Sequence, residues 1–170
     1  RAFRCRRRTQ GTERHGALTA LTGDQVRLTK LTHYAMRLLM YLAQRPDRLC
    51  TIAEVAGSYG VSEAHMMKVT HQLGLAGWIE TVRGKGGGMR LAHAPQDISL
   101  GAVVRSMEPD FFMVECLSTG NTCVLTGACK LRSVMYGALR RFVDSLGGNC
   151  LADSLPKPTA QAFAMRELMG

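Results

Sequence analysis

A change of apolar period in the first half of the chain constrains the fold most. The stretch VSEAHMMKVTHQLGLAG (61–77) repeats apolar residues at the three- and four-residue spacing of one helix face. The next residues, WIETVR (78–83) and MRLA (89–92), have the composition of strands and enclose the glycine-rich turn GKGGG. These stretches predict a helix followed directly by a two-strand hairpin.

Two further helices are predicted upstream of this unit. RLTKLTHYAMRLLMYLAQ (27–44) has a continuous apolar face, with Thr29 or Thr32 available as its N-cap. TIAEVAGSYG (51–60) is shorter and opens with the T-x-x-E pattern of a capping box. Ser62 is a natural N-cap for the third helix. The order helix, short helix, helix, hairpin is that of a winged helix-turn-helix, so we expect a mainly α fold with a two-strand wing.

The second half of the chain predicts two more helices and a tail. ISLGAVVRSME (98–108) forms the first helix, and CKLRSVMYGALRRFVDSL (129–146) forms a long C-terminal one. The long helix has an apolar stripe that we expect to face inward: Leu131, Val134, Ala138 and Phe142. A short helix is possible at 160–169. We therefore divide the chain into 1–25, a DNA-binding domain at 26–95, a cysteine loop with a long helix at 96–155, and a tail at 156–170.

The charge of the chain indicates an anionic partner. The net charge is +9, which favours nucleic acid, but residues 1–25 hold six of the arginines. This segment is either a basic disordered arm or sequence upstream of the true start at Val26, and we favour the second because the helical pattern begins there. The chain has no apolar run of the ~18 residues that a membrane span needs and no signal-peptide pattern. A cytoplasmic protein without membrane contact is expected.

The third helix and the hairpin tip provide candidate DNA contacts. The second helix of a helix-turn-helix lies in the major groove, where its exposed side chains reach base edges and phosphates. A glycine-rich tip lets the backbone approach phosphates closely, although a solvated lysine or a simple turn explains each residue taken alone. The candidates are Ser62, Glu63, Ala64, His65, Lys68 and Gln72 on the helix, and Arg83, Gly84, Lys85, Gly86, Gly87 and Gly88 on the hairpin.

Three of the six cysteines lie in ECLSTGNTCVLTGACKL, at Cys116, Cys123 and Cys129. Disulfides do not fit a reducing cytosol. Zinc prefers four ligands, often in close C-x2-C pairs, so the wider gaps and the absent fourth cysteine count against it. Three unrelated buried cysteines are the plainer alternative, and their clustering in a loop rich in Gly, Ser, Thr and Asn weakens it. An iron–sulfur cluster is held by thiolates, and another side chain can replace one of them. The other cysteines have no close cysteine neighbour and are interpreted as incidental: Cys5, Cys50 and Cys150.

Four segments together resemble the NsrR family of nitric-oxide-sensing transcriptional repressors, which is related to IscR. They are RLTKLTHYAMRLLMYLA, YGVSEAHMMKVTHQLGLAGWIETVRGKGGGMRLA, MEPDFFMVEC with the cysteine loop, and NCLADSL. The resemblance implies a homodimer joined along the helix that starts at Cys129, with one [2Fe-2S] or [4Fe-4S] cluster in each subunit. Cys116 and Cys123 are the other two implied cysteine ligands, and the implied DNA partner is a palindromic operator.

One position departs from the NsrR pattern. In relatives, the first helix of the other subunit commonly provides an Asp after LTKFT as the fourth ligand, and His33 takes this place in LTKLTHYA. Imidazole is a competent iron ligand, so His33 is either this ligand or an ordinary surface histidine.

The resemblance implies that nitric oxide nitrosylates the cluster, releases DNA and derepresses genes for nitric oxide detoxification. Two alternatives stay open: a cluster that senses redox state, oxygen or iron supply, and a zinc-stabilised DNA-binding module. An enzyme is not expected, because no nucleophile–base set is present. The acidic pair Glu108 and Asp110 flanks Pro109, where a helix cap or bend explains it.

Overall fold

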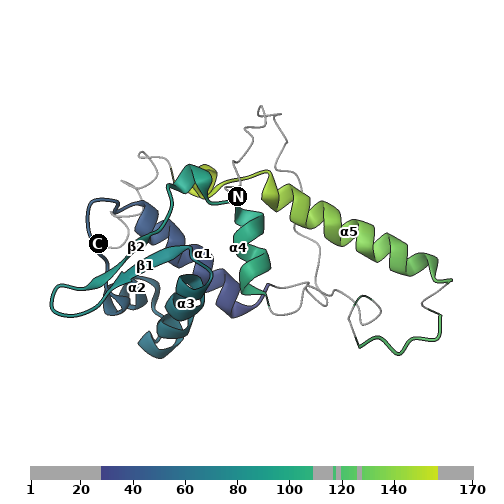
Figure 1. The fold of residues 1–170 in the computed structure, drawn as a ribbon, viewed down its shortest axis with the longest axis horizontal. Coiled ribbons are helices and arrows are strands. Elements are labelled where there is room, and N and C mark those ends of the chain that lie inside the picture. Colours follow the sequence, from purple (N-terminus) through teal and green to yellow (C-terminus); the bar gives the residue numbers. More distant parts are fainter. Residues whose placement is uncertain (1–27, 109–116, 118–119, 126–127, 157–170) are drawn as a thin grey trace.

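The computed structural model describes residues 28–108, 117, 120–125 and 128–156 (Figure 1). Residues 1–25, Cys116 and the possible helix at 160–169 lie outside this part of the chain. The elements are α1 (Lys30–Ala43), α2 (Ile52–Tyr59), α3 (Glu63–Leu75), β1 (Ile79–Val82), β2 (Gly88–Leu91), the 3-10 turn η1 (Pro95–Asp97), α4 (Leu100–Met107), α5 (Lys130–Gly147) and the 3-10 turn η3 (Leu151–Ser154). The mainly α, winged helix-turn-helix architecture with one long C-terminal helix is confirmed.

The predicted caps start the first three helices. The hydroxyls of Thr29, Thr51 and Ser62 each accept a hydrogen bond from a backbone N–H of the first turn, at 3.3, 3.2 and 3.4 Å. These bonds satisfy donors that a helix start otherwise leaves unpaired. The capping box expected at α2 is only half formed, because the Glu54 carboxylate accepts from the Tyr41 hydroxyl and from Arg48 instead.

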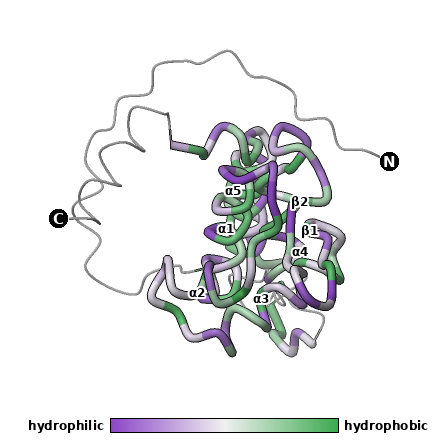
Figure 2. Tube along the Cα trace, turned by 90° about the vertical axis from the view of Figure 1, so that its left-hand side faces the viewer, coloured by the Kyte–Doolittle hydropathy of each residue, from purple (hydrophilic) through white to green (hydrophobic). Residues whose placement is uncertain are grey.

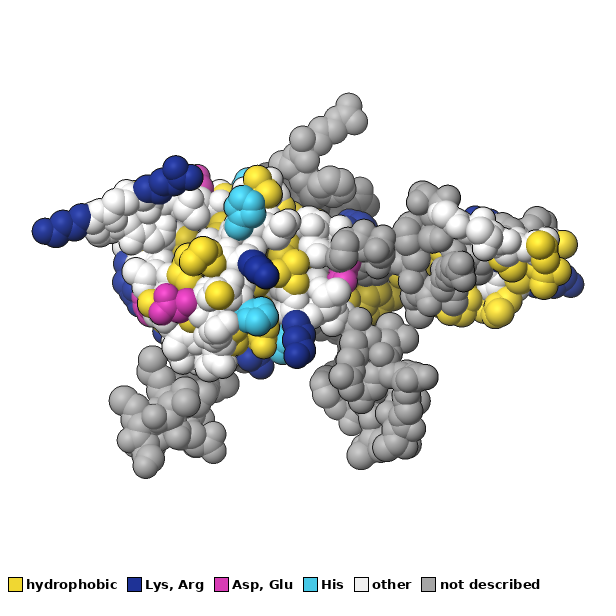
Figure 3. Space-filling model, turned by 90° about the horizontal axis from the view of Figure 1, so that it is seen from below, with side chains coloured by type: hydrophobic (Ala, Val, Ile, Leu, Met, Phe, Trp, Pro, Cys, Tyr) yellow, Lys and Arg dark blue, Asp and Glu magenta, His cyan; other side chains and the backbone are white. Residues whose placement is uncertain are grey.

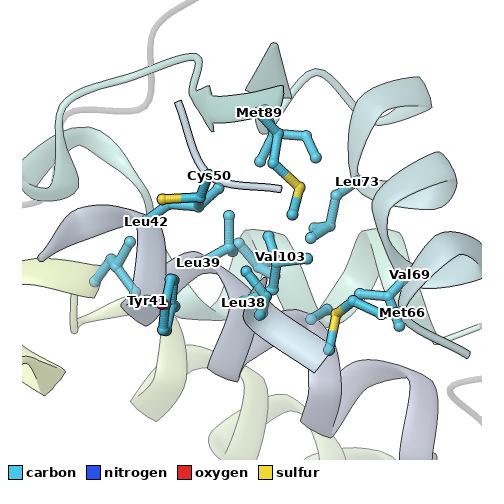
Figure 4. Packing of buried hydrophobic residues seen from close by; sticks show 14 of the residues in the cluster. Leu38, Leu39, Tyr41, Leu42, Cys50, Met66, Val69, Leu73, Met89 and Val103 are labelled. Atoms are coloured by element: carbon cyan, nitrogen blue, oxygen red, sulfur yellow. The ribbon is translucent and has the colours of Figure 1, made fainter. Parts of the chain in front are cut away.

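The core lies between α1, α3, α4 and the base of the hairpin (Figure 4). Hydrophobic and hydrophilic residues alternate within the helices of the described trace, as expected for helices with one buried face (Figure 2). The fully buried side chains at the centre include Leu38, Leu39, Met66, Leu73, Met89 and Val103. The predicted faces of α1, α3 and α4 supply most of these residues, so the helical periodicity identified the core correctly.

The wing is the antiparallel pair β1–β2, in which Ile79 lies opposite Leu91 and Val82 opposite Gly88. Cys50 extends this sheet, because its backbone N–H donates to the Met89 carbonyl at 3.0 Å and its carbonyl accepts from Met89 at 2.8 Å. A Cβ atom on Gly88 would lie 2.7 Å from the Cys50 carbonyl oxygen. Gly88 therefore permits the close approach of the three segments at the base of the wing.

Helix α5 differs from the expectation for its apolar stripe. None of its residues is buried, and Leu131 and Val134 are 63 % and 66 % exposed. The inward orientation was wrong because α5 extends away from the rest of the molecule and contacts α4 (Figure 1). Its C-terminal end is held by the segment that follows, where the Leu151 N–H donates to the Ile98 carbonyl at 2.8 Å. None of the described helices has the length and hydrophobicity to cross a membrane.

Candidate nucleic-acid interface and metal centre

The exposed side of α3 is the first part of the candidate nucleic-acid interface. The helix buries Met66, Val69 and Leu73 against the core. This packing turns the other side to solvent, and the predicted contacts Lys68 and Gln72 are exposed there. The side chains of α3 are thus divided between a core face and a face free to approach a ligand.

Ser62 and His65 are tied to each other at the start of α3. The Ser62 hydroxyl accepts from the His65 N–H, and it lies 2.8 Å from Nδ1 of the same residue. This contact orients the imidazole at the helix N-terminus, where backbone N–H groups give a partial positive charge. The pair can meet a phosphate or a base edge as one unit with a fixed geometry.

The tip of the wing is cationic, and its glycines are required by its shape. Arg83 and Lys85 are exposed. Gly84 and Gly86 have φ angles of 98° and 78°, a region that side-chain-bearing residues rarely adopt. A Cβ atom on Gly87 would lie 2.3 Å from the Val82 carbonyl oxygen. The turn itself therefore explains the glycines, and it presents the two cations at the end of the hairpin.

Figure 3 shows the lower face of the molecule, on which α3 and the wing lie. Lys or Arg side chains project at the wing end of this face, and Lys or Arg together with His side chains lie over its central part. Hydrophobic side chains are exposed between them. Met67, 57 % exposed, and His71 belong to the open side of α3 and were not among the predicted contacts. The spacing of Met67, three residues after Ala64, was the signal available in the sequence.

The cysteine loop is described in part. Cys123 is exposed, and its N–H donates to the Asn121 side-chain oxygen at 2.9 Å. Cys129 is half-buried in the N-cap position of α5. Cys116 lies outside the described residues, so the convergence of the three predicted ligands stays a prediction.

His33 lies on the exposed side of α1, about one turn before the middle of the helix. Its ring stacks on that of Tyr34, with centroids 5.8 Å apart and planes inclined by 20°. Among the described residues, no three His, Cys, Asp or Glu side chains are close enough to hold one metal ion. His33 itself is exposed to solvent.

A contact missed from the sequence joins the start of α1 to the end of α4. The Glu108 carboxylate accepts from the Thr29 N–H at 2.8 Å and from the Thr29 hydroxyl at 3.2 Å. The cap expected near Pro109 thus belongs to α1 rather than to α4. Because residue 109 begins the segment that leads to Cys116, Glu108 fixes the origin of the cysteine loop against the first helix of the DNA-binding domain.

The donor chemistry of the loop fits an iron–sulfur cluster. Cys123 is exposed and Cys129 is half-buried, so both side chains lie outside the core, and thiolates are the ligands that such clusters use. The remaining described cysteines are buried: Cys50 and Cys150. Burial raises the pKa of the Cys50 thiol, which keeps it protonated within the core. The two loop cysteines are therefore better suited to ligation than the two buried ones.

Comparison with known proteins places the chain. Residues 28–156 match the model of the family Rrf2, described as "Iron-dependent Transcriptional regulator". The chain belongs to the Rrf2 family. This match includes both the winged helix-turn-helix and the whole cysteine loop.

Several Rrf2 relatives carry the name HTH-type transcriptional regulator NsrR. The protein from Halalkalibacterium halodurans is 43 % identical over 76 % of this chain and 90 % of its own length. The protein from Bacillus subtilis is 42 % identical over 75 % of this chain and 89 % of its own length. The resemblance to NsrR is confirmed, and the chain is a transcriptional regulator rather than an enzyme.

Solved structures of Rrf2 proteins share the fold. T. potens IscR matches with a TM-score of 0.61 and 24 % identity, over 76 % of this chain and 85 % of that one. The global cysteine regulator CymR of B. subtilis matches with a TM-score of 0.58 and 19 % identity, over 76 % of this chain and 95 % of that one. At these identities the likeness concerns the architecture alone.

Proposed function

We propose that this Rrf2 protein is a homodimeric repressor that binds a palindromic operator and releases it in response to nitric oxide. The observation with the most weight is the extent of similarity to proteins named NsrR. The relative from Geobacillus kaustophilus is 40 % identical over 147 residues and matches along its whole length. Such a match spans the DNA-binding unit and the loop in which a signal would be received.

The DNA-binding step uses the face formed by α3 and the wing. Lys68 on α3, with Arg83 and Lys85 at the wing tip, places positive charge at two separate points of this face. Phosphates attract these groups whatever the base sequence, and the contacts fix the register of α3 in the groove. The Ser62–His65 pair and Gln72 add hydrogen-bonding groups for base edges.

Dimer formation uses α5. Within the part of the chain that the structure describes, no residue of this helix is buried, and Leu131 and Val134 of its apolar stripe are exposed. An exposed stripe of this kind on a long helix marks an interaction surface, and a second copy of the helix supplies a matching stripe. Two copies then place two α3 helices for half-sites about one DNA turn apart, roughly 34–36 Å.

The signal is received at the cysteine loop. Cys116, Cys123 and Cys129 would hold an iron–sulfur cluster, with His33 from the second copy as a candidate fourth ligand. When bound, the cluster would supply iron atoms that react with nitric oxide. The exposure of His33 and of Cys123 on different parts of the chain is compatible with ligands from two subunits meeting at one site.

Glu108 provides a route from the loop to the DNA-binding domain. Its two hydrogen bonds to Thr29 hold the start of α1, whose buried side packs on α3. A change in the loop that moves Glu108 removes the acceptor of the Thr29 N–H and hydroxyl at the N-cap of α1. The position of α3 relative to its partner in the dimer then changes, which is how release of the operator would follow.

The test is an absorbance spectrum of anaerobically purified protein, taken before and after a stoichiometric nitric oxide donor, with operator binding measured in parallel. Loss of sulfide-to-iron absorption together with loss of operator binding is expected. Operator binding that ignores nitric oxide, or a colourless protein that contains zinc, contradicts the proposal.

Two cysteine variants make this test specific. Cys123→Ala should give a colourless protein, because it removes one of three thiolate ligands. Cys50→Ala is the matched control, since it removes a thiol that lies in the core at the base of the wing. A Cys123→Ala protein with full cluster content would remove the loop from the ligand set.

Regulation by iron supply is the second candidate, and the words "Iron-dependent" in the description of the family favour it. The two functions differ in what releases the operator. A protein that loses DNA binding on iron chelation and keeps it with nitric oxide would be a sensor of iron supply.

A further inference from the structure

The exposed side of α3, which would face DNA, contains apolar residues as well as polar ones. Met67 is 57 % exposed near the middle of the helix, and Ala64 is exposed one turn before it. The core does not need either residue, because Met66 and Val69 already fill that side. Isolated exposed apolar residues are common on protein surfaces, so their location decides whether they have a role.

The location of these two residues is specific. Residues three apart on a helix lie on the same side, so Ala64 and Met67 form one short apolar strip. Both belong to the first half of α3, which spans Glu63–Leu75. In a helix-turn-helix the N-terminal residues of the recognition helix are those that contact base edges.

Positively charged side chains are also exposed on α3 and on the wing. Lys68 follows Met67 directly in α3, and Arg83 and Lys85 are exposed in the wing. Figure 3 shows Lys or Arg side chains both at the projecting end of one face and over its central part. Phosphate contacts by these side chains would position the first half of α3 in the major groove. The apolar strip then contacts base edges rather than solvent, so DNA is the partner expected for it.

The major groove offers an apolar side chain only one apolar partner. Guanine, cytosine and adenine present hydrogen-bonding groups there, whereas thymine presents its C5-methyl group beside a carbonyl. Alanine is among the side chains that contact this methyl group, and the flexible thioether of methionine adapts to irregular apolar surfaces.

We propose that Ala64 and Met67 read thymine methyl groups in each half-site, which makes Met67 a specificity-determining residue. This inference rests on the proposed binding of DNA by α3. It assigns the recognition of T·A pairs to apolar contact and leaves orientation on the duplex to Lys68, Arg83 and Lys85. Changing the thymine methyl and changing Met67 should therefore have linked effects.

The experiment replaces thymine by deoxyuridine, which lacks only the C5-methyl group. The full-length protein selects its operator from random duplex DNA, and each thymine of one half-site is then substituted in turn. We expect one or two positions at which the affinity falls about fourfold, roughly the worth of one buried methyl group. Substitution in both half-sites should multiply the two effects.

The Met67→Ala variant links this loss to the side chain. It should bind the thymine operator several-fold more weakly and should no longer distinguish deoxyuridine at one of those positions. Leu75→Ala is the matched control, since Leu75 is an exposed apolar residue at the C-terminal end of the same helix. It should retain full sensitivity to deoxyuridine.

Lys68→Ala separates phosphate contacts from base reading. It should weaken binding to all sequences alike and reduce the salt dependence by about one counterion, with deoxyuridine sensitivity unchanged. Uniform affinity for thymine and deoxyuridine operators overturns the inference, as does a Met67→Ala protein with unchanged sensitivity. A protein that selects no duplex at all overturns the proposed DNA binding and the inference with it.

Discussion

The winged helix-turn-helix body, formed by α1 to α4 and the wing, contains helices with a periodic apolar face, and helix α5 has such a face too. That face is buried in the body and exposed in α5. In the body, α1 buries Ala35, Leu38, Leu39 and Leu42. In α5, which is longer, the apolar stripe recurs with similar spacing and no residue is buried. The difference shows that periodicity predicts that a helix has a face to cover, and that it does not identify what covers it.

The two regions meet through a close backbone contact between α4 and α5. At the α4–α5 contact, Gly101 lies so close to α5 that a Cβ atom there would be 2.7 Å from the Gly147 backbone nitrogen. The body is therefore held together by interlocked side chains, whereas α5 is joined to it through backbone contact at one end. Four changes test this contrast, from the largest expected effect to the smallest.

Leu38→Ala should lower the free energy of unfolding by about 2–5 kcal/mol, because it leaves a cavity in the centre of the body. Urea unfolding followed by the fluorescence of Trp78, the single tryptophan, measures the loss. Leu131→Ala on α5 is the control and should change the monomer by no more than about 0.5 kcal/mol. Equal losses from the two leucines would remove the distinction between the regions.

Leu131→Asp combined with Val134→Asp should weaken self-association at least about a hundredfold, since charges replace two exposed apolar side chains of the stripe. Sedimentation equilibrium measures the dimer, and circular dichroism checks that the helices are kept. Leu75→Asp, on the exposed side of α3, should leave self-association unchanged. A dimer that tolerates the α5 charges would have to use another surface.

Gly101→Ala should cost about 1–3 kcal/mol of stability, because the added methyl group forces α4 and α5 apart. Gly147→Ala is a matched control at the same crossing, since its Cβ would have no atom within 4 Å. That change should be neutral or stabilising by up to about 1 kcal/mol, as for other helical glycines. Urea unfolding of both variants measures the difference, and similar values for the two would argue against a tight crossing.

The smallest effect concerns the ion pair that joins α2 to the segment after α1. Hydrogen bonds from Arg48 and Tyr41 lower the pKa of Glu54 from 4.5 to about 2. A carboxyl group whose pKa is lowered by folding adds stability above pH 4.5, and this stability is lost as the pH falls towards 2. The side chain is 29 % exposed, so solvent screening limits the contribution to about 1 kcal/mol.

Glu54→Gln should therefore narrow the difference in unfolding free energy between pH 6 and pH 2.5. Glu80→Gln is the control for this pH dependence, because it removes the more exposed ion pair with Arg90 across the wing. An identical pH dependence in the Glu54→Gln and native proteins would contradict the role of this carboxylate.

The local features of the fold were predictable because short-range interactions produce them. Thr29 and Ser62 cap their helices through hydroxyls next to unpaired N–H groups, and these residue types were visible in the sequence. Glu54 was a different case. Its position predicted that its carboxylate would accept a hydrogen bond at the start of α2. In the folded chain the carboxylate accepts hydrogen bonds from Tyr41 and Arg48 instead.

For the candidate site, the sequence predicted which residues would be exposed, and their roles stay a prediction. The exposed cations of α3 and the wing followed from the order of the elements, and their exposure agrees with the expected positions. The periodicity already placed Met66 and Val69 on the core face of α3, and Met67 on its other side was not considered as a contact. The structure shows that Met66 and Val69 are buried and that Met67 is 57 % exposed.

By itself the sequence determined the helices, their caps, the glycine turn of the wing and the thiols available in the loop, because each depends on neighbours within a few residues. Tertiary structure decided which faces are covered, and it decided that Glu108 caps a helix 79 residues earlier in the chain. It also decided that Gly101 must have no side chain. These outcomes depend on distances between segments that are far apart in the sequence, and packing of the folded chain sets those distances.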